Sequence, residues 1–382
     1  MTEVRNVAVL VGNGLSIAFN PALNLRAITT EMVERMKAAS DEGDDVVTAM
    51  KEIAERALPA GVTSEDDFEV LVGAFGAENR TMGYLERLAA LTQPQDDELQ
   101  AAIQLVANFA ARVRDTGLSH VLQVIFENSH AYADDAEHLH SFVTAVTSSF
   151  DGRVSLSNLN YDTLLLSAVL TVCNMAEVAD LADGRTKVSI VDGDGDTVAR
   201  VPLLRETRHD FSPKHRVLLL HLHGSITYWA GQEGTVYAKL SRDHLEDLEQ
   251  WQAVRDGTTG LRPVVVLANQ RDKSAHVQEF PFSLAYEMFV DSLATSNHWL
   301  IVGYSFRDEP VNAKLQAEFN DRAREEKPRV LVVTHGDDLA VHVVERAFGW
   351  GKEDGSSVDW LTVVRTGANG VENTAEWAEF IA

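Results

Sequence analysis

The sequence is poor in cysteine and in basic side chains, and each shortage excludes a class of protein. Cys173 is the only cysteine among 382 residues. A single cysteine excludes an internal disulfide and any cysteine-based zinc cluster. Acidic side chains outnumber basic ones, and the formal net charge is −25. Because such a chain repels phosphate backbones, we expect no direct nucleic-acid binding.

Segments that would take the chain into or across a membrane are also missing. No apolar run is long enough to span a bilayer. The first residues, MTEVRNVAVL, lack the basic start and the cleavage site of a signal peptide. Hydrophobic residues make up 45% of the sequence, which is enough to form a sizeable core. We therefore expect a cytoplasmic globular protein with no membrane association.

Short apolar segments alternate with helical patterns over much of the chain. The first strand is predicted at residues 7–11, and further strands recur after residue 151. Over residues 25–150, apolar residues recur at spacings of three and four, which is typical of helices. Parallel strands covered by helices on both faces produce this alternation. The sequence therefore predicts an α/β fold, a single Rossmann-like domain over residues 1–382, with a helical insertion at residues 25–150 after the first strand.

The first predicted strand ends in the turn Gly12-Asn13-Gly14. Two glycines one residue apart let the chain turn sharply and let its backbone approach a ligand, and backbone N–H groups there can hold a pyrophosphate. The third glycine of the dinucleotide-binding fingerprint is replaced by Ile17. By itself, the turn is equally compatible with a plain connection from strand to helix.

Three later polar turns also follow predicted strands. They are SNLNYDTLL at residues 157–165, LHLHGSI at residues 220–226 and IVGYSF at residues 301–306. In an open α/β sheet, ligands bind in the crevice outside the carboxyl ends of the strands. Four polar turns at one edge therefore predict a binding site there.

These four turns, in this order, resemble the motifs of the sirtuin-like family. GNGLS is similar to the family's Gly-Ala-Gly-x-Ser turn, with Asn13 in place of alanine. NLNYD resembles Thr-Gln-Asn-Ile-Asp and places Asn160 and Asp162 on the motif's asparagine and aspartate. LHG matches the position of the catalytic histidine, which is His223 here, and VGYSF resembles Gly-Thr-Ser-Leu. The resemblance implies a dinucleotide site whose cofactor-binding residues are Gly12, Asn13, Gly14, Ser16, Gly303, Tyr304 and Ser305.

Departures from the family pattern indicate which branch the chain resembles. A deacylating sirtuin carries a four-cysteine zinc ribbon, which a single cysteine cannot build. The strand that ends in Phe-Gly-Glu in such enzymes ends here in Ala268-Asn269-Gln270, and the Pro-Asp-Phe-Arg run is missing. The chain is more similar to the bacterial sirtuin-like NAD hydrolases of anti-phage defence. That resemblance implies NAD as the substrate, a homo-oligomer, and a HerA-like ATPase or Argonaute-like partner.

Cleaving the nicotinamide bond of NAD passes through a cation-like ribose, so the site must hold the ribose and position a water. A histidine can accept and return a proton near neutral pH, which makes His223 the expected base. The Asn160 amide offers both a donor and an acceptor without adding charge. Asp162 holds a ribose hydroxyl, braces the loop or caps the following helix, and Ser16 either caps the first helix or touches phosphate.

Several other patterns have competing interpretations. The DGDGD run at residues 192–196 resembles the start of a calcium loop but lacks the glycine and glutamate that such a loop needs later, and indicates a hairpin tip. His221 and His223 lie two residues apart, yet no third ligand is evident, so we expect no metal. Phe68 and Glu69 either line the cleft or belong to an amphipathic core helix.

Two alternatives to NAD hydrolysis remain at this point. One is transfer chemistry, in the form of protein deacylation or ADP-ribosylation. The other is a non-catalytic module that senses NAD or ADP-ribose.

Overall fold

The computed structural model describes residues 4–39, 41, 43–57, 68–69, 71–72, 85, 87–89, 91, 97–132, 136–191, 197–231, 236–266 and 270–382. Its centre is a seven-stranded sheet in the order β12-β11-β10-β1-β2-β6-β3, and every neighbouring pair is parallel. The strands are β1 (Val7–Val11), β2 (Val154–Asn158), β3 (Val178–Ala179), β6 (Val217–His221), β10 (His298–Val302), β11 (Arg329–Val333) and β12 (Leu361–Val364). This architecture confirms the predicted α/β, Rossmann-like fold.

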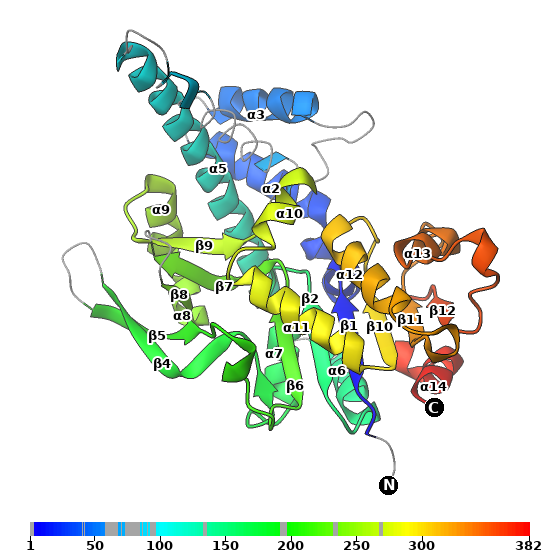
Figure 1. Ribbon diagram of the computed structural model, residues 1–382. Coiled ribbons are helices and arrows are strands. Elements are labelled where there is room, and N and C mark those ends of the chain that lie inside the picture. The colour runs from blue at the N-terminus through cyan, green and yellow to red at the C-terminus, as the bar shows by residue number, and fades with distance from the viewer. Residues whose placement is uncertain are drawn as a thin grey trace.

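Helices cover both faces of this sheet (Figure 1). Val7, Val9 and Val11 of β1 belong to one apolar core, and Ala8 and Leu10 belong to another. Because successive strand residues point to opposite faces, a strand with both faces covered is apolar throughout. Helices that contribute to the first core include α1 (Asn13–Phe19), α6 (Glu137–Ser149), α7 (Leu164–Val172) and α14 (Ala375–Ile381). Those that contribute to the second include α11 (Phe282–Thr295), α12 (Glu309–Asn320) and α13 (Val341–Ala347).

The segment between β1 and β2 is helical where the structure describes it. Besides α1 and α6 it contains η1 (Pro21–Leu23), α2 (Leu25–Ala38), α3 (Gly43–Ala57) and α5 (Asp97–Tyr132). In Figure 1, α2, α3 and the long α5 lie beyond the carboxyl ends of the parallel strands. This arrangement puts helical side chains above the edge at which a ligand is expected. The bounds of an insertion at residues 25–150 stay a prediction.

A second sheet of five strands is the main departure from the predicted architecture. It is antiparallel, in the order β4-β5-β8-β7-β9. Its strands are β4 (Ala182–Val191), β5 (Thr197–Leu204), β7 (Gly224–Gly231), β8 (Tyr237–Lys239) and β9 (Leu261–Val265). The predicted hairpin is confirmed as β4 and β5, and its DGDGD tip lies outside the described residues. The strand before Ala268-Asn269-Gln270, predicted as part of the parallel sheet, is β9 and pairs with β7 in the second sheet instead.

Gly224 explains why the chain leaves the parallel sheet at this point. It follows β6 by three residues, begins β7 and has a φ of +84°. A side chain at this position would overlap the carbonyl oxygen of Val264, which precedes the last residue of β9. Only glycine tolerates both conditions. His223, immediately before it, is thereby held at the corner between the two sheets.

The remaining short elements connect the parts of this framework. They are η3 (Arg208–Asp210), α8 (Arg242–Glu246), α9 (Leu248–Asp256), α10 (Gln270–His276), η4 (Arg324–Glu326), η5 (Lys352–Asp354) and η6 (Val371–Asn373). Among the described residues, no helix combines the length and the apolar character needed to cross a membrane.

Candidate active site

The candidate site lies where the strand order reverses at the carboxyl edge of the parallel sheet. From β1 the chain continues to β2 on one side, and it later returns to β10 on the other side of β1. Open α/β sheets bind ligands at such a switch point. The four predicted turns follow β1, β2, β6 and β10, so the topology brings them to one edge as expected.

The two glycine turns pack directly on each other. The N–H groups of Gly12 and Gly14 donate to the carbonyl oxygens of Val302 and Gly303, both at 2.9 Å. A Cβ on Gly12 would lie 2.6 Å from the Gly303 oxygen, and one on Gly14 would lie 2.6 Å from the Gly303 Cα. In this conformation these glycines allow two backbones to meet, and their N–H groups are already occupied. Their predicted contact with a dinucleotide stays a prediction.

A buried chain of hydrogen bonds joins the first two turns. The Asn160 amide Nδ2 donates to the Gly12 carbonyl at 3.1 Å and to Ser16 Oγ at 2.8 Å. Ser16 Oγ in turn donates to Asp162 Oδ2 at 2.5 Å. The amide nitrogen of Asn160 is therefore used inside the protein, and its Oδ1 is the atom left for a ligand.

Asp162 braces the loop with both of its oxygens. Oδ2 accepts from Ser16, and Oδ1 accepts from the Leu164 backbone N–H at 3.0 Å, at the start of α7. Burial raises the pKa of Asp162, against the lowering effect of these two hydrogen bonds. These contacts match the bracing interpretation of Asp162, whereas the residue before α7 is Thr163, so Asp162 lies one position before the predicted cap. The capping interpretation of Ser16 is wrong, because the residue before α1 is Gly12 and no side chain caps that helix.

His223 pairs with a carboxylate from the loop that follows β10. Its Nε2 lies 3.2 Å from Asp308 Oδ2, and the two side chains are 4% and 7% exposed. The Tyr286 hydroxyl of α11 lies 3.4 Å from the same nitrogen. Asp308 precedes α12 and caps it, since its Oδ1 accepts from the Val311 N–H at 3.1 Å.

A lysine and a second carboxylate extend this pair into a buried network. Lys273 Nζ lies 3.1 Å from Asp308 Oδ2 and 3.3 Å from Glu69 Oε2. The Tyr161 hydroxyl donates to Glu69 Oε1 at 2.5 Å. Glu69 comes from the helical segment after β1, so this network ties that segment to the edge of the sheet.

The charges of the network hold one another in their ionised forms. Burial alone would raise the pKa of Asp308, but His223 and Lys273 hold it well below its ordinary value. Burial would likewise raise the pKa of Glu69, and the charges of Lys273 and His223 lower it. Burial opposes the charge on Lys273, yet the two carboxylates raise its pKa. Nearby opposite charges outweigh desolvation in all three groups.

A small cavity of about 50 Å³ adjoins these groups. Its lining includes Asn13, Phe68, Glu69, Asn160 and Asp162. Phe68 and Glu69 thus line the cavity, as in the first of their two predicted positions, the cleft rather than an amphipathic core helix. Pockets for drug-sized ligands have volumes of about 300–1,000 Å³, so this cavity is large enough for a water-sized molecule but too small for a dinucleotide.

The fourth turn buries two of its side chains and exposes a third. Tyr304 is buried, and its hydroxyl donates to the Asp308 carbonyl at 3.1 Å and to Asn312 Oδ1 at 2.9 Å. Phe306 is buried beside it, which matches the core interpretation of these two rings. Ser305 is exposed. The roles assigned to Gly303, Tyr304 and Ser305 toward a cofactor stay predictions.

His221 is separate from the His223 pair. It is fully buried, its ring packs against Tyr228 at 5.4 Å between centroids, and burial lowers its pKa to about 4. Within the part of the chain that the structure describes, no three His, Cys, Asp or Glu side chains are arranged to hold a metal ion. Of the stretch Ala268-Asn269-Gln270, the first two residues lie outside the described residues, and α10 begins at the third.

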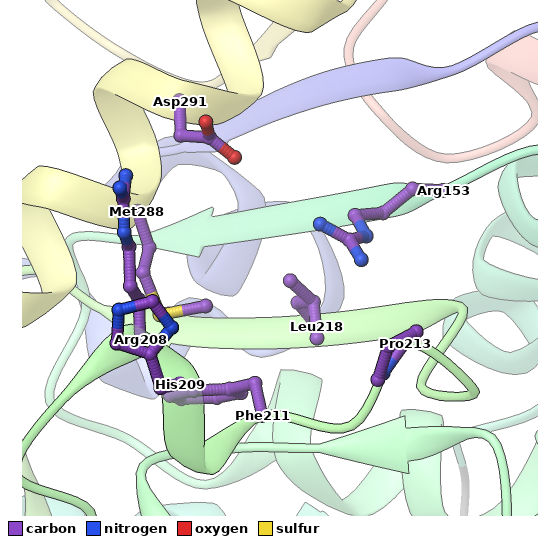
Figure 2. Close-up of a pocket in the computed structure, with 8 residues that line it drawn as sticks. All are labelled: Arg153, Arg208, His209, Phe211, Pro213, Leu218, Met288 and Asp291. Atoms are coloured by element: carbon purple, nitrogen blue, oxygen red, sulfur yellow. The ribbon is translucent and has the colours of Figure 1, made fainter.

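A larger hollow lies at the opposite, amino end of the parallel strands. Figure 2 shows Met288 and Asp291 projecting from α11, with Leu218 of β6 and Arg153 beside them. Its volume is about 360 Å³, and the rest of its lining comes from Arg208, His209, Phe211 and Pro213. None of the four predicted turns contributes to it. Size alone therefore does not identify the candidate site.

Asp308, Lys273 and Tyr286 are the site residues that sequence reasoning missed. A signal existed for Asp308, because aspartate followed by proline two residues later is typical of a helix start, and Pro310 does follow. Nothing in the sequence indicates that this carboxylate meets His223. Lys273 and Tyr286 lie in ordinary helical patterns and carry no motif.

The fold and this edge define the protein as a Rossmann-like α/β protein with a buried polar site at the carboxyl ends of its strands. A family profile of the SIR2-like domain matches residues 155–349, just over half of the 382 residues. The chain therefore belongs to the SIR2-like domain family. A search of curated protein sequences finds no match.

Three solved sirtuin structures are similar to 64% of this chain. One comes from work on the mechanism and regulation of Sir2 enzymes, with 14% identity, 67% of its own chain covered and a TM-score of 0.32. One is Sir2 with the inhibitor EX-527, 2′-O-acetyl-ADP-ribose and deacetylated p53 peptide, with 11% identity, 71% coverage and a TM-score of 0.30. The third, from work on sirtuin substrate affinity, has 11% identity, 72% coverage and a TM-score of 0.31. The family assignment rests on the domain match.

Proposed function

We propose that this protein is an NAD glycohydrolase that cleaves NAD to nicotinamide and ADP-ribose. The observation that carries the proposal is the buried chain from Asn160 through Ser16 to Asp162, together with the buried His223–Asp308 pair, at the switch point of a SIR2-like fold. A chain of neutral and acidic groups around a histidine suits a reaction whose transition state carries positive charge on a ribose.

Each of these residues has a separate role in the reaction. Asp162 and Ser16 hold Asn160, so that its Oδ1 accepts a hydrogen bond from a ribose hydroxyl or from water. The C1′–N bond breaks, and its electron pair leaves with nicotinamide. Water adds at C1′, and His223 accepts the proton that the water loses, directly or through a ribose hydroxyl. Asp308 is charged and beside His223, so it stabilises the imidazolium that forms.

Binding of NAD requires the site to open. The described cavity of about 50 Å³ is too small, and Glu69 and Lys273 lie between the helical segment and the sheet edge. We propose that these groups separate when NAD enters. An enzyme built in this way is slow until something stabilises its open form.

The direct test incubates the purified protein with NAD and follows nicotinamide and ADP-ribose by chromatography. We expect product from the wild type and a loss of at least about 100-fold in Asn160→Ala and His223→Ala, the scale of acid–base and positioning effects. Matched controls are Asn174→Ala and His209→Ala, which remove the same side chains from exposed positions away from this edge and should retain turnover. Unchanged turnover in the site variants, with folding verified by circular dichroism, would contradict the assignment.

The same incubation separates the other activities. Labelled ADP-ribose attached to protein would indicate transfer, and nicotinamide release that requires an acylated peptide would indicate deacylation. NAD that binds but remains intact would indicate a sensor.

The biological role follows from the motif resemblance. We propose that the protein depletes NAD during anti-phage defence, with a HerA-like ATPase or an Argonaute-like protein as the activating partner. We also propose a homo-oligomer, for which the support is a group of exposed apolar side chains on α5, namely Leu99, Leu105, Val106 and Phe109. Light scattering of the wild type beside Phe109→Ser tests the oligomer.

A further inference from the structure

Asp308 is anchored independently of His223. Its Oδ1 accepts from the Val311 N–H at 3.1 Å, and its backbone carbonyl accepts from the Tyr304 hydroxyl at 3.1 Å. One carboxylate oxygen is therefore committed to the start of α12, and the other, Oδ2, faces His223. A side chain held at both its backbone and one oxygen has little freedom to turn away.

The environment keeps this carboxylate charged and keeps water away from it. Asp308 and His223 are almost fully buried, and Lys273 Nζ lies 3.1 Å from the same Oδ2. A buried carboxylate is stable only with a counter-charge, which Lys273 supplies. Asp308 Oδ2 accepts no well-aligned hydrogen bond from the described residues, although His223 Nε2 and Lys273 Nζ both lie within ion-pair distance. Such contacts often tighten only when a substrate binds.

The contact also distinguishes the two ring nitrogens of His223. Asp308 Oδ2 and the Tyr286 hydroxyl both lie beside Nε2, at 3.2 Å and 3.4 Å. A carboxylate beside one nitrogen places the proton on that nitrogen. The other nitrogen, Nδ1, then carries the lone pair that can accept a proton.

We propose that Asp308 is a positioning residue, which holds the His223 ring by Nε2 so that Nδ1 acts as the base toward the substrate. This inference deepens the proposed NAD hydrolysis and rests on it. Asp308 itself touches no reacting atom. Its competing role is purely structural, as the cap of α12 and the partner of Lys273.

The variant Asp308→Ser separates these roles. Serine caps helices nearly as well as aspartate, so the start of α12 is retained, but its short side chain cannot also reach His223. The double variant Asp308→Ser with Lys273→Met removes the lysine charge that would otherwise be left without its nearer partner. The matched control is Asp247→Ser, because Asp247 caps α9 in the same way from an exposed position.

In the kinetic measurement we expect kcat to fall about 10-fold to 100-fold in Asp308→Ser, part of the ~10²–10⁴ that acid–base catalysis supplies. KM for NAD should change less than about twofold, since Asp308 does not contact the substrate. The double variant should keep the low kcat, because removing the lysine charge does not restore the contact between residue 308 and His223, and Asp247→Ser should match the wild type. Recovery of kcat in the double variant would show a structural role only and would overturn the proposal.

A second measurement does not depend on turnover. Nitrogen chemical shifts of ¹⁵N-histidine-labelled protein report which ring nitrogen carries the proton, with the His223 signals identified by their loss in His223→Gln. We expect the Nε2–H form in the wild type and a mixture of forms in Asp308→Ser. Identical spectra would overturn the proposal even if the wild type hydrolyses NAD. A wild type that shows the expected spectra but releases no nicotinamide would instead contradict the proposed function.

Discussion

The two ends of the parallel sheet hold charged side chains in opposite ways. At the carboxyl end, Lys273, Asp308 and Glu69 form a buried network, and Glu69 also lines a cavity of about 50 Å³. At the amino end, a hollow of about 360 Å³ has Arg208 on its rim, paired with Glu287 at 3.6 Å, with both side chains more than half exposed. The larger hollow has solvated charges, and the smaller cavity has fixed ones.

This difference shows why volume is a poor guide to chemistry in this molecule. Solvated ion pairs are screened and free to change partners, so they hold no fixed geometry. Buried charges interact strongly and hold their neighbours in place. The closed carboxyl end therefore has the properties of a reaction site, whereas the open amino end has those of a surface.

The largest expected effect comes from breaking the buried network. Lys273→Met leaves two carboxylates without their cation and should lower the free energy of unfolding at pH 7 by about 3 kcal/mol, measured by urea denaturation. Because the folded pKa of Asp308 is lowered, the stabilisation it provides is present above the ordinary aspartate pKa and is lost as the pH falls through the folded value. The difference in the free energy of unfolding between Lys273→Met and the wild type should therefore become smaller below about pH 4. A gap that is small at pH 7 or independent of pH would contradict a strong buried network.

A smaller effect should follow from separating the two glycine turns. Gly303 has a φ of +62°, and an added Cβ would overlap Gly14 and the Leu15 nitrogen, whereas Gly257 has a φ of +66° with nothing within 4 Å of such a Cβ. Gly257→Ala should cost about 1 kcal/mol for its backbone conformation alone. Gly303→Ala should cost about 2 kcal/mol more because two backbones must move apart. Equal values from thermal unfolding of the two variants would mean that the close packing of the turns is unimportant.

The smallest effect is expected at the amino end. A double-mutant cycle of Arg208→Gln and Glu287→Gln should give a coupling energy of no more than about 0.5 kcal/mol, because both side chains are well exposed. The coupling should vanish in high salt. A coupling near that of the Lys273 network would remove the contrast between the two ends of the sheet.

Much of the framework was predictable because it depends on local pattern. Five consecutive apolar residues at Val7–Val11 predict a strand buried on both faces, and the four polar turns follow strands that the topology aligns. The second sheet was harder to predict from the sequence. Its strand β7 begins three residues after the end of β6, which is too short a connection for the sequence to indicate a new strand. The positive φ of Gly224 makes the change of direction possible.

The candidate site shows the same division at the level of single residues. Asn160, Asp162 and His223 stand in motifs, so their types and order are visible in the sequence. Which atoms of Asn160 remain free, and which oxygens of Asp162 are already used, depend on Ser16, which is distant in the chain. The same is true of Asp308 and Lys273, whose contacts join segments separated by tens to hundreds of residues.

By itself, the sequence determined the strands, the helices that cover them and the polar turns at their ends, because periodicity and glycine placement act over a few residues. Only the tertiary structure decided that the glycine turns pack on each other and that His223 faces a carboxylate. It also decided that the helical segment closes the site through Glu69 and Lys273. The physical reason is that desolvation and charge pairing depend on distances between elements, and those distances exist only once the chain has folded.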